Sequence, residues 1–194
     1  VRALGADAVA CIGSVTAPDF AERFVGTAVD QFKGLDIIVN NAGYTWDNVI
    51  QKMTDEQWYA ILDCHLTAPF RILRAAQPVI RALAKADGEA GVRHVRKVVN
   101  ISSMAGLRGG NNITAYAASK AGMIGFTKAI AKEFAARGVT VDERCRGYAH
   151  DSLYLPRARQ NSGPPGGKQA APRRGSADPR RPPLCAQRPS IILE

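Results

Sequence analysis

The sequence contains few cysteines and no long apolar run, and each shortage excludes a class of protein. Its four cysteines are scattered, with no C-x-x-C pair, so they favour neither a disulfide framework nor a zinc site. No apolar run approaches the roughly 20 residues that span a bilayer. The first residues lack the charged-then-apolar layout of a secretory signal. We therefore expect a cytoplasmic protein that binds neither a metal ion nor a membrane.

The positive charge of the chain is concentrated towards one end. The formal net charge is +9 and the isoelectric point is about 9.7, values that favour an anionic partner such as nucleic acid. Residues 1–142, however, carry 16 basic and 13 acidic side chains, whereas residues 143–194 carry 10 and 4 and also hold eight of the 11 prolines. We therefore predict a folded domain over 1–142, followed by a disordered basic tail rich in Pro, Arg and Gly over 143–194.

The first 142 residues alternate short β-branched runs with longer helical patterns. The runs predict strands at 8–12, 35–40, 97–102 and 139–141. Apolar residues at helical spacing predict helices after Thr16, after a capping box at Thr54–Gln57, and over 116–137, with a surface loop at 85–96. This alternation indicates an α/β fold with a parallel sheet. Ligands of such sheets bind beyond the carboxyl ends of the strands.

Residues that can take part in binding or catalysis follow two of these strands and lie at the start of the last predicted helix. Asn40-Asn41-Ala42-Gly43 follows one strand, and Ser103 ends the next. Tyr116 and Lys120 are four residues apart, so they share a helical face. Since an ammonium ion favours the ionised form of a nearby phenol, the two can act as an acid–base pair. The alternative is structural, with Tyr116 capping an amphipathic helix and Lys120 solvated.

Taken together, the Asn-Asn-Ala-Gly run, Ser103, Tyr116 and Lys120 resemble the motifs of the short-chain dehydrogenase/reductase superfamily. The stretch ASKAGMIGFTKAIAKEFAARGVTV is most similar to 3-oxoacyl-[acyl-carrier-protein] reductases. The resemblance covers residues 1 to about 141. It implies a Rossmann-like doubly wound parallel sheet, incomplete at both ends. It also implies hydride transfer between the nicotinamide of NADP or NAD and a carbonyl or alcohol.

The resemblance implies roles for individual residues. Tyr116 would protonate the carbonyl oxygen, Ser103 would position it, and Lys120 would favour the phenolate and bind the nicotinamide ribose. Besides Tyr116 and Lys120, the cofactor would contact Val15, Asn41, Ala42 and Gly43. The helices at 55–85 and 116–137 resemble those that pair into a four-helix interface, which implies a homodimer or homotetramer.

The chain departs from the superfamily's pattern at several places. It begins after the opening strand and Gly-rich turn that would bind the pyrophosphate, so we interpret it as N-terminally truncated. Ser14 stands where the family usually has Asp, and His65 where it usually has Asn. His65 either completes a proton relay in place of that Asn or is a helix-interface histidine satisfied by its neighbours. Beyond Val141, charged residues stand where an apolar strand is expected.

The tail and the overall function each admit alternatives. The resemblance is lost within a strand, which favours a shifted reading frame or a sequence error as the origin of the tail. The alternative is that the tail is native and binds nucleic acid through its basic residues. The leading function is an NAD(P)-dependent oxidoreductase acting on a small carbonyl or acyl thioester. The alternatives are a catalytically inactive fragment that associates through its two interface helices, and a basic-tailed nucleic-acid-binding module. NAD and NADP are not distinguished.

Overall fold

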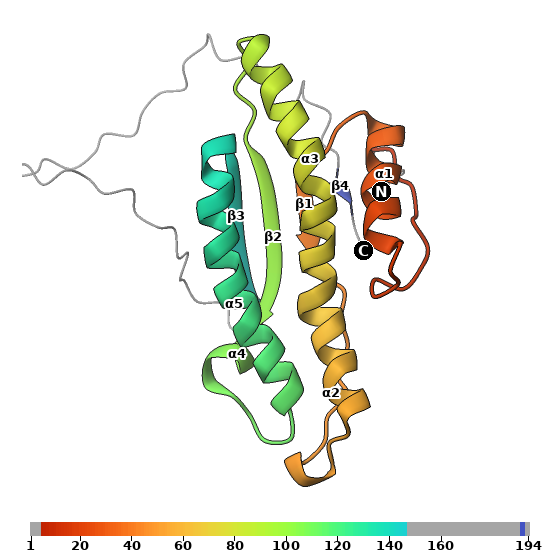
Figure 1. The fold of residues 1–194 in the computed structure, drawn as a ribbon, viewed down its shortest axis with the longest axis vertical. Coiled ribbons are helices and arrows are strands. Elements are labelled where there is room, and N and C mark those ends of the chain that lie inside the picture. The colour runs from red at the N-terminus through yellow and green to blue at the C-terminus, as the bar shows by residue number, and fades with distance from the viewer. Residues whose placement is uncertain (1–4, 147–190, 193–194) are drawn as a thin grey trace, which may run out of the picture. The chain divides into compact units, whose positions relative to one another are not determined.

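The computed structural model describes residues 5–146 and 191–192 (Figure 1). The helices are α1 (Phe20–Phe32), α2 (Asp55–Leu62), α3 (Ala68–Glu89), α4 (Ala105–Arg108) and α5 (Thr114–Phe134). Shorter helical turns occupy Ile50–Lys52 and Ala135–Arg137, and a π-helical turn, Asp63–Thr67, joins α2 to α3. The strands are β1 (Ile37–Asn40), β2 (Arg96–Ser103), β3 (Val139–Arg146) and β4 (Ile191–Ile192).

The strands form one parallel sheet in the order β3-β2-β1-β4. β2 pairs with β3 along its whole length, from Arg96 opposite Val139 to Ser103 opposite Arg146. On its other side β2 pairs with β1, which brings Asn40 opposite Asn100. β4 pairs with β1 at Ile37 and Ile38 only. The parallel α/β sheet expected from the alternating sequence pattern is confirmed.

Helices cover one face of this sheet. In Figure 1, α3 passes in front of β1 and α5 in front of β3, and α1, which packs against α3, stands beside them. Every second residue of β1 and β2 is buried, including Ile38, Val98 and Asn100, while the alternate residues are half-buried or exposed. The apolar core combines these strand residues with one side of each helix, including Phe24, Ile72, Leu73 and Phe134. The burial of this face gives the sheet its main stabilisation.

Local sequence signals set several element ends. Thr54 caps α2: its hydroxyl accepts the Gln57 N–H, and the Gln57 side chain accepts the Thr54 N–H. Gly138 takes the left-handed conformation, at φ 69°, where α5 and its last turn give way to β3. Pro69 lies in the first turn of α3, where a missing N–H costs least, and Pro78 lies inside that helix. The predicted capping box and helix stop are confirmed.

Three predicted elements differ from the structure. Residues 8–12 form no strand, because no described strand pairs with them, and the Ile12 side chain is 85% exposed. The predicted loop at 85–96 is helical as far as Glu89, where α3 ends. β3 continues past Val141 to Arg146, because pairing with β2 satisfies its backbone despite the charged side chains. The boundary at residue 142 stays a prediction, and residues 147–190 and 193–194 of the predicted tail lie outside the described residues.

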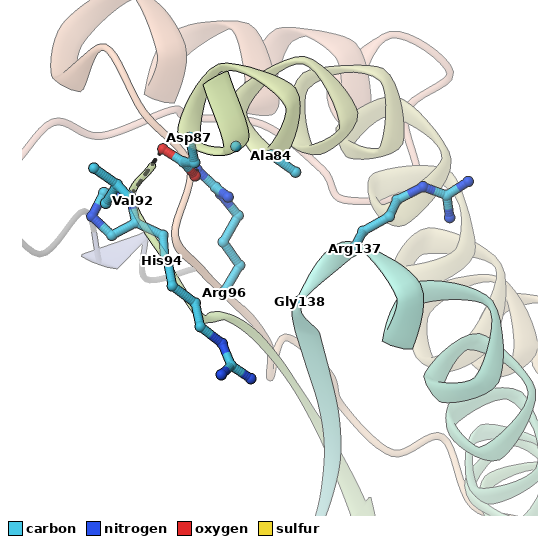
Figure 2. A pocket seen from close by; sticks show the side chains of 9 residues that line it. Ala84, Asp87, Val92, His94, Arg96, Arg137 and Gly138 are labelled. Atoms are coloured by element: carbon cyan, nitrogen blue, oxygen red, sulfur yellow. Dashed lines mark hydrogen bonds and ion pairs between the residues drawn. The ribbon is translucent and has the colours of Figure 1, made fainter. Parts of the chain in front are cut away.

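A charged cluster joins the end of α3 to the start of β2. Arg96 is only 4% exposed, and its Nη2 lies 2.8 Å from the Asp87 carboxylate, while His94 Nδ1 approaches the same carboxylate at 3.1 Å. Figure 2 shows His94 and Arg96 reaching toward Asp87, while Arg137 points away, beside a cavity of about 180 Å³. Because a buried guanidinium needs a counter-charge, the Asp87 carboxylate stabilises Arg96 and ties the end of α3 to the start of β2.

Asp87→Asn is therefore expected to lower the free energy of unfolding by about 2 kcal/mol, measured by urea denaturation at pH 7, because it removes the closest counter-charge of the buried Arg96 and leaves only the longer ion pair with Asp36 at 3.8 Å. Burial alone would raise the pKa of Asp87, but hydrogen bonds and charges from Arg96 and His94 outweigh it and lower that pKa. The stabilisation is thus present above the carboxyl's ordinary value of 3.8 and is lost as pH falls through the folded pKa.

The matched control is Glu89→Gln, two residues further along the same helix, which removes an exposed ion pair with Lys85. We expect it to change stability by no more than about 0.5 kcal/mol. Equal effects of the two substitutions would contradict the role assigned to Asp87.

Candidate active site

Most of the predicted site residues lie where β1 and β2 end and α5 begins. β1 ends at Asn40 and β2 at Ser103, and because the strands are parallel, both carboxyl ends reach the same edge of the sheet. The first turns of α5 carry Tyr116 and Lys120. This edge is where open α/β sheets bind their ligands.

Helix α5 holds Lys120 against β2 and beside Tyr116. The Lys120 side chain is 5% exposed, and its Nζ donates a hydrogen bond to the Ile101 carbonyl at 2.6 Å. The same nitrogen lies 5.6 Å from the centroid of the half-buried Tyr116 ring, as the spacing of four residues predicts. Burial lowers the pKa of Lys120, and the nearby Cys64 acts in the opposite direction. Lys120 is thus a desolvated cation directed at the tyrosine, not a solvated surface lysine.

Ser103 ends β2 two residues beyond the carbonyl that holds Lys120. Its Oγ accepts the Ala105 N–H at 3.1 Å, so its own O–H is left to donate elsewhere. Ser103 is followed by α4 and by the glycine-rich segment 106–110 (GLRGG), which begins within α4. α4 packs closely on α5, since a Cβ added at Gly106 would lie 2.7 Å from the Lys120 backbone. Gly106 therefore allows the segment after Ser103 to fold back onto the helix that carries Tyr116.

The other predicted cofactor residues occupy two different places. Asn41, Ala42 and Gly43 form the loop after β1, and Asn41 and Gly43 are exposed. Gly43 lies against the ring of His65, and a Cβ added there would overlap the imidazole. Val15 lies in the segment before α1, where it is half-buried and packs against the hydrophobic core.

His65 lies in the π-helical turn between α2 and α3, and its ring contacts the ring of Tyr116. Its side chain is 4% exposed, and its Nε2 is 2.7 Å from the Tyr44 carbonyl oxygen. The imidazole meets the Tyr116 ring edge-on, with centroids 5.1 Å apart and an angle of 84° between the planes. The structure therefore brings His65, Tyr116 and Lys120 together.

A buried chain of polar side chains behind the site was not predicted. Asn40 Nδ2 donates to Asn100 Oδ1 at 2.8 Å, and Asn100 Nδ2 donates to Thr127 Oγ1 at 2.9 Å. These three side chains link β1, β2 and α5, with Thr127 about three turns after Tyr116. A signal for it was present, since both strands read as an apolar run ending in Asn, and pairing those runs in register sets the two amides opposite each other.

Comparisons with known proteins agree with this geometry. Residues 1–157 match the sequence profile of the short chain dehydrogenase family. The chain is 38% identical over 140 residues to 3-oxoacyl-[acyl-carrier-protein] reductase FabG of Vibrio cholerae, covering 72% of this chain and 53% of that protein. It is 39% identical over 150 residues to the Escherichia coli protein of the same name, covering 77% and 57% respectively.

A solved structure leads to the same family. A short chain dehydrogenase from Mycobacterium avium superposes with a TM-score of 0.65 at 36% identity, over 73% of this chain and 48% of that one. The chain belongs to the short chain dehydrogenase family. It spans about half the length of the curated relatives it matches. Within residues 5–146, no helix combines the length and apolar character needed to cross a membrane.

Asn100→Ala is expected to lower the free energy of unfolding by about 3 kcal/mol in urea denaturation, because it leaves buried polar atoms of Asn40 and Thr127 unpaired. The exposed Asn111→Ala serves as the control, with an expected change within about 0.5 kcal/mol. If Asn100→Ala and Asn111→Ala have the same free energy of unfolding, the buried polar side chains do not stabilise the site.

Proposed function

We propose that this chain carries the catalytic half of an NAD(P)-dependent oxidoreductase that interconverts a carbonyl and an alcohol. The observation that supports it most is the buried Lys120 ammonium beside Tyr116, held on the Ile101 carbonyl. A cation is costly to bury, so a buried ammonium beside a phenol favours a functional pair over a solvated lysine. A nearby cation stabilises the phenolate that an acid–base tyrosine forms.

In the proposed reaction, Tyr116 gives its phenolic proton to the substrate's carbonyl oxygen. Its O–H bond breaks, a new O–H bond forms on the substrate, and the phenolate that remains is stabilised by the Lys120 charge. Ser103, whose O–H is free to donate, holds the same carbonyl oxygen. A bound nicotinamide cofactor supplies the hydride that reduces the carbonyl carbon.

The residues present fit one part of such a cofactor. An ammonium ion has three donors. Lys120 uses one on Ile101, so two are left for the hydroxyls of the nicotinamide ribose. The short side chains of Asn41, Ala42 and Gly43 leave the end of β1 open to a second part of the cofactor.

The substrate class, the assembly and the compartment are proposed from the relatives. The curated proteins that the chain resembles are named for the reduction of 3-oxoacyl-[acyl-carrier-protein], so a 3-oxoacyl thioester, an intermediate of fatty acid synthesis, is the first substrate to try. We further propose a cytoplasmic homodimer or homotetramer that uses NADP or NAD. The competing candidate is an inactive piece that still associates, favoured by the coverage of only about half of the relatives' length.

Tyr116→Phe is expected to lower kcat/KM for a 3-oxoacyl thioester at least about 100-fold, because the phenolic proton is lost. Fluorescence titration should still show saturable NADPH binding, since Lys120 and the loop after β1 are unchanged. The control is Tyr59→Phe, which changes a tyrosine that is 65% exposed and should leave turnover unchanged. Retention of turnover by Tyr116→Phe would refute the assigned chemistry.

Titration with NADPH and NADH separates the enzyme from the inactive piece. Saturable quenching of protein fluorescence, together with oxidation of the cofactor when the thioester is added, supports the enzyme. If neither quenching nor cofactor oxidation is seen at millimolar cofactor, in a chain that melts cooperatively, the inactive piece explains the chain better than the enzyme does.

A further inference from the structure

The segment before α1 is held by side chains of two helices. No described strand pairs with residues 8–17. Instead, Arg23 of α1 donates from Nη1 to the Ile12 carbonyl at 3.1 Å. Arg71 of α3 donates from Nη1 to the Thr16 carbonyl, also at 3.1 Å. Because hydrogen bonds from charged donors are stronger than those between neutral groups, the two arginines fix this segment where sheet pairing does not.

The last part of the segment is the turn Ser14–Ala17. The Ala17 N–H donates to the Ser14 carbonyl at 3.0 Å, and the Thr16 N–H donates to Ser14 Oγ at 3.3 Å. These bonds set the shape of the turn locally. Its place on the rest of the molecule depends on two other contacts, since Val15 packs against the hydrophobic core and Arg71 holds the Thr16 carbonyl.

Arg71 holds this turn at the same edge of the sheet as the site. α1 leads into β1 and α3 leads into β2, so each helix begins at the edge where its strand ends. Arg71 lies in the first turn of α3, and its Nη1 is also 3.6 Å from Asp63 Oδ1. Asp63 begins the π-helical turn whose His65 ring lies against Gly43. One side chain therefore joins the turn Ser14–Ala17 to the segment that contacts the loop after β1.

A dinucleotide extends beyond the contacts that Lys120 and the loop after β1 provide. Neighbouring strands are only about 4.8 Å apart, and a dinucleotide binds across the carboxyl ends of several strands. In the proposed function the nicotinamide ribose binds at Lys120, beside β2, and a second part binds at the end of β1. α1 packs against α3 and, in Figure 1, stands on the side of α3 away from α5. A ligand that runs from α5 across the end of β1 therefore reaches the start of α1.

The chemistry of the turn suits the uncharged end of such a ligand. Residues 13–17 (GSVTA) carry no charged side chain. They offer the hydroxyl groups of Ser14 and Thr16, whose oxygens lie 2.9 Å apart, and the half-buried apolar side chain of Val15. Phosphates are bound best by charged donors, whereas an adenine ring and its ribose bind to apolar surface with a few polar partners. The turn therefore fits adenosine better than it fits the pyrophosphate.

We propose that Arg71 is a positioning residue that holds the turn Ser14–Ala17 at the edge of the sheet, where the turn contacts the adenosine half of a nicotinamide dinucleotide. This proposal rests on the proposed function, because it assumes such a cofactor. Arg71 touches none of the reacting atoms, so it affects how tightly the adenosine half binds and leaves proton transfer by Tyr116 unchanged. The Arg71 side chain is 29% exposed, so removing its ion pair changes the stability of the whole fold little.

NMR titration of the whole nitrogen-15-labelled chain tests where the adenosine half binds. Adenosine monophosphate, which carries only that half, should shift the amide signals of Val15 and Thr16 in a saturable way. Reduced nicotinamide mononucleotide, which lacks adenosine, should shift the amides of Tyr116 and Lys120 and leave those of the turn in place. Adenosine monophosphate that fails to bind, or that binds without shifting the turn, would overturn the proposal.

Arg71→Ala is expected to weaken the binding of adenosine monophosphate about 10-fold, which corresponds to one hydrogen bond from a charged donor. The affinity for reduced nicotinamide mononucleotide should stay unchanged, whereas a merely structural arginine would affect both ligands. Arg71→Lys keeps a cationic donor and should recover part of the affinity. The control is Arg81→Ala, at an exposed arginine of the same helix, which should change neither affinity. Equal weakening of both ligands by Arg71→Ala, or no weakening, would overturn the proposal.

Asp63→Asn gives a second test that leaves Arg71 in place. The substitution removes the carboxylate beside the guanidinium, so it should weaken the binding of adenosine monophosphate less than Arg71→Ala does. It should have no further effect when Arg71 is already replaced by Ala, a coupling that a double-mutant cycle measures. Additive effects of the two substitutions would show that Asp63 and Arg71 act separately, and would contradict the proposed connection.

These measurements need no turnover, so failure of this proposal and failure of the proposed function are distinguishable. If turnover requires Tyr116 but the affinity for adenosine monophosphate does not depend on Arg71, only the role of Arg71 is refuted. If adenosine monophosphate binds at the turn and depends on Arg71 while no thioester is reduced, the role of Arg71 is supported and the proposed reaction is refuted.

Discussion

The hydrogen bond from the Lys120 ammonium to the Ile101 carbonyl is the contact on which the arrangement of the site depends. It joins the second turn of α5 to the end of β2 at 2.6 Å, in a place that is almost closed to water. A lysine loses most of its hydration there, so the carbonyl must replace the lost water. Tyr116, one turn earlier on the same helix, takes its position from this contact.

Further polar contacts extend this connection to either side. Two turns beyond Lys120, Thr127 accepts from Asn100, which in turn accepts from Asn40, so the helix is tied to both central strands. On the other side His65 connects Tyr116 to the loop after β1. Removing one member of such a network leaves its buried polar partners unpaired, which costs free energy of unfolding. At the opposite end of β2, the separate Asp87–Arg96 pair ties the end of α3 to the start of this strand.

The local features of the fold could be predicted from sequence because each depends on few residues. The capping box at Thr54, the stop at Gly138 and the shared face of Tyr116 and Lys120 all follow from short-range rules. The apolar run at 8–12 satisfied the same rules for a strand and forms none, because a strand also needs a neighbour. The continuation of α3 to Glu89 brings Asp87 to Arg96 of β2, a contact between elements that no local pattern encodes.

The features of the site show the same difference between short-range patterns and contacts between distant elements. Residue types and spacing identified Ser103, Tyr116 and Lys120, whereas the Lys120–Ile101 bond, the amide chain and the bond of His65 to the Tyr44 carbonyl depend on how strands pair and helices pack. Val15 was assigned to the cofactor by resemblance, and in the structure it packs against the core beside α1. Its role stays a prediction.

Amide hydrogen exchange along α5 tests most directly whether the helix is held on β2 in this chain. If the Lys120 and Asn100 contacts form, the amides from Lys120 to Thr127 exchange as slowly as those of Val98 to Ile101 in β2. Rapid exchange along α5 while β2 stays protected would show that the helix is not docked on the strand, and that the proposed acid–base pair has no fixed geometry.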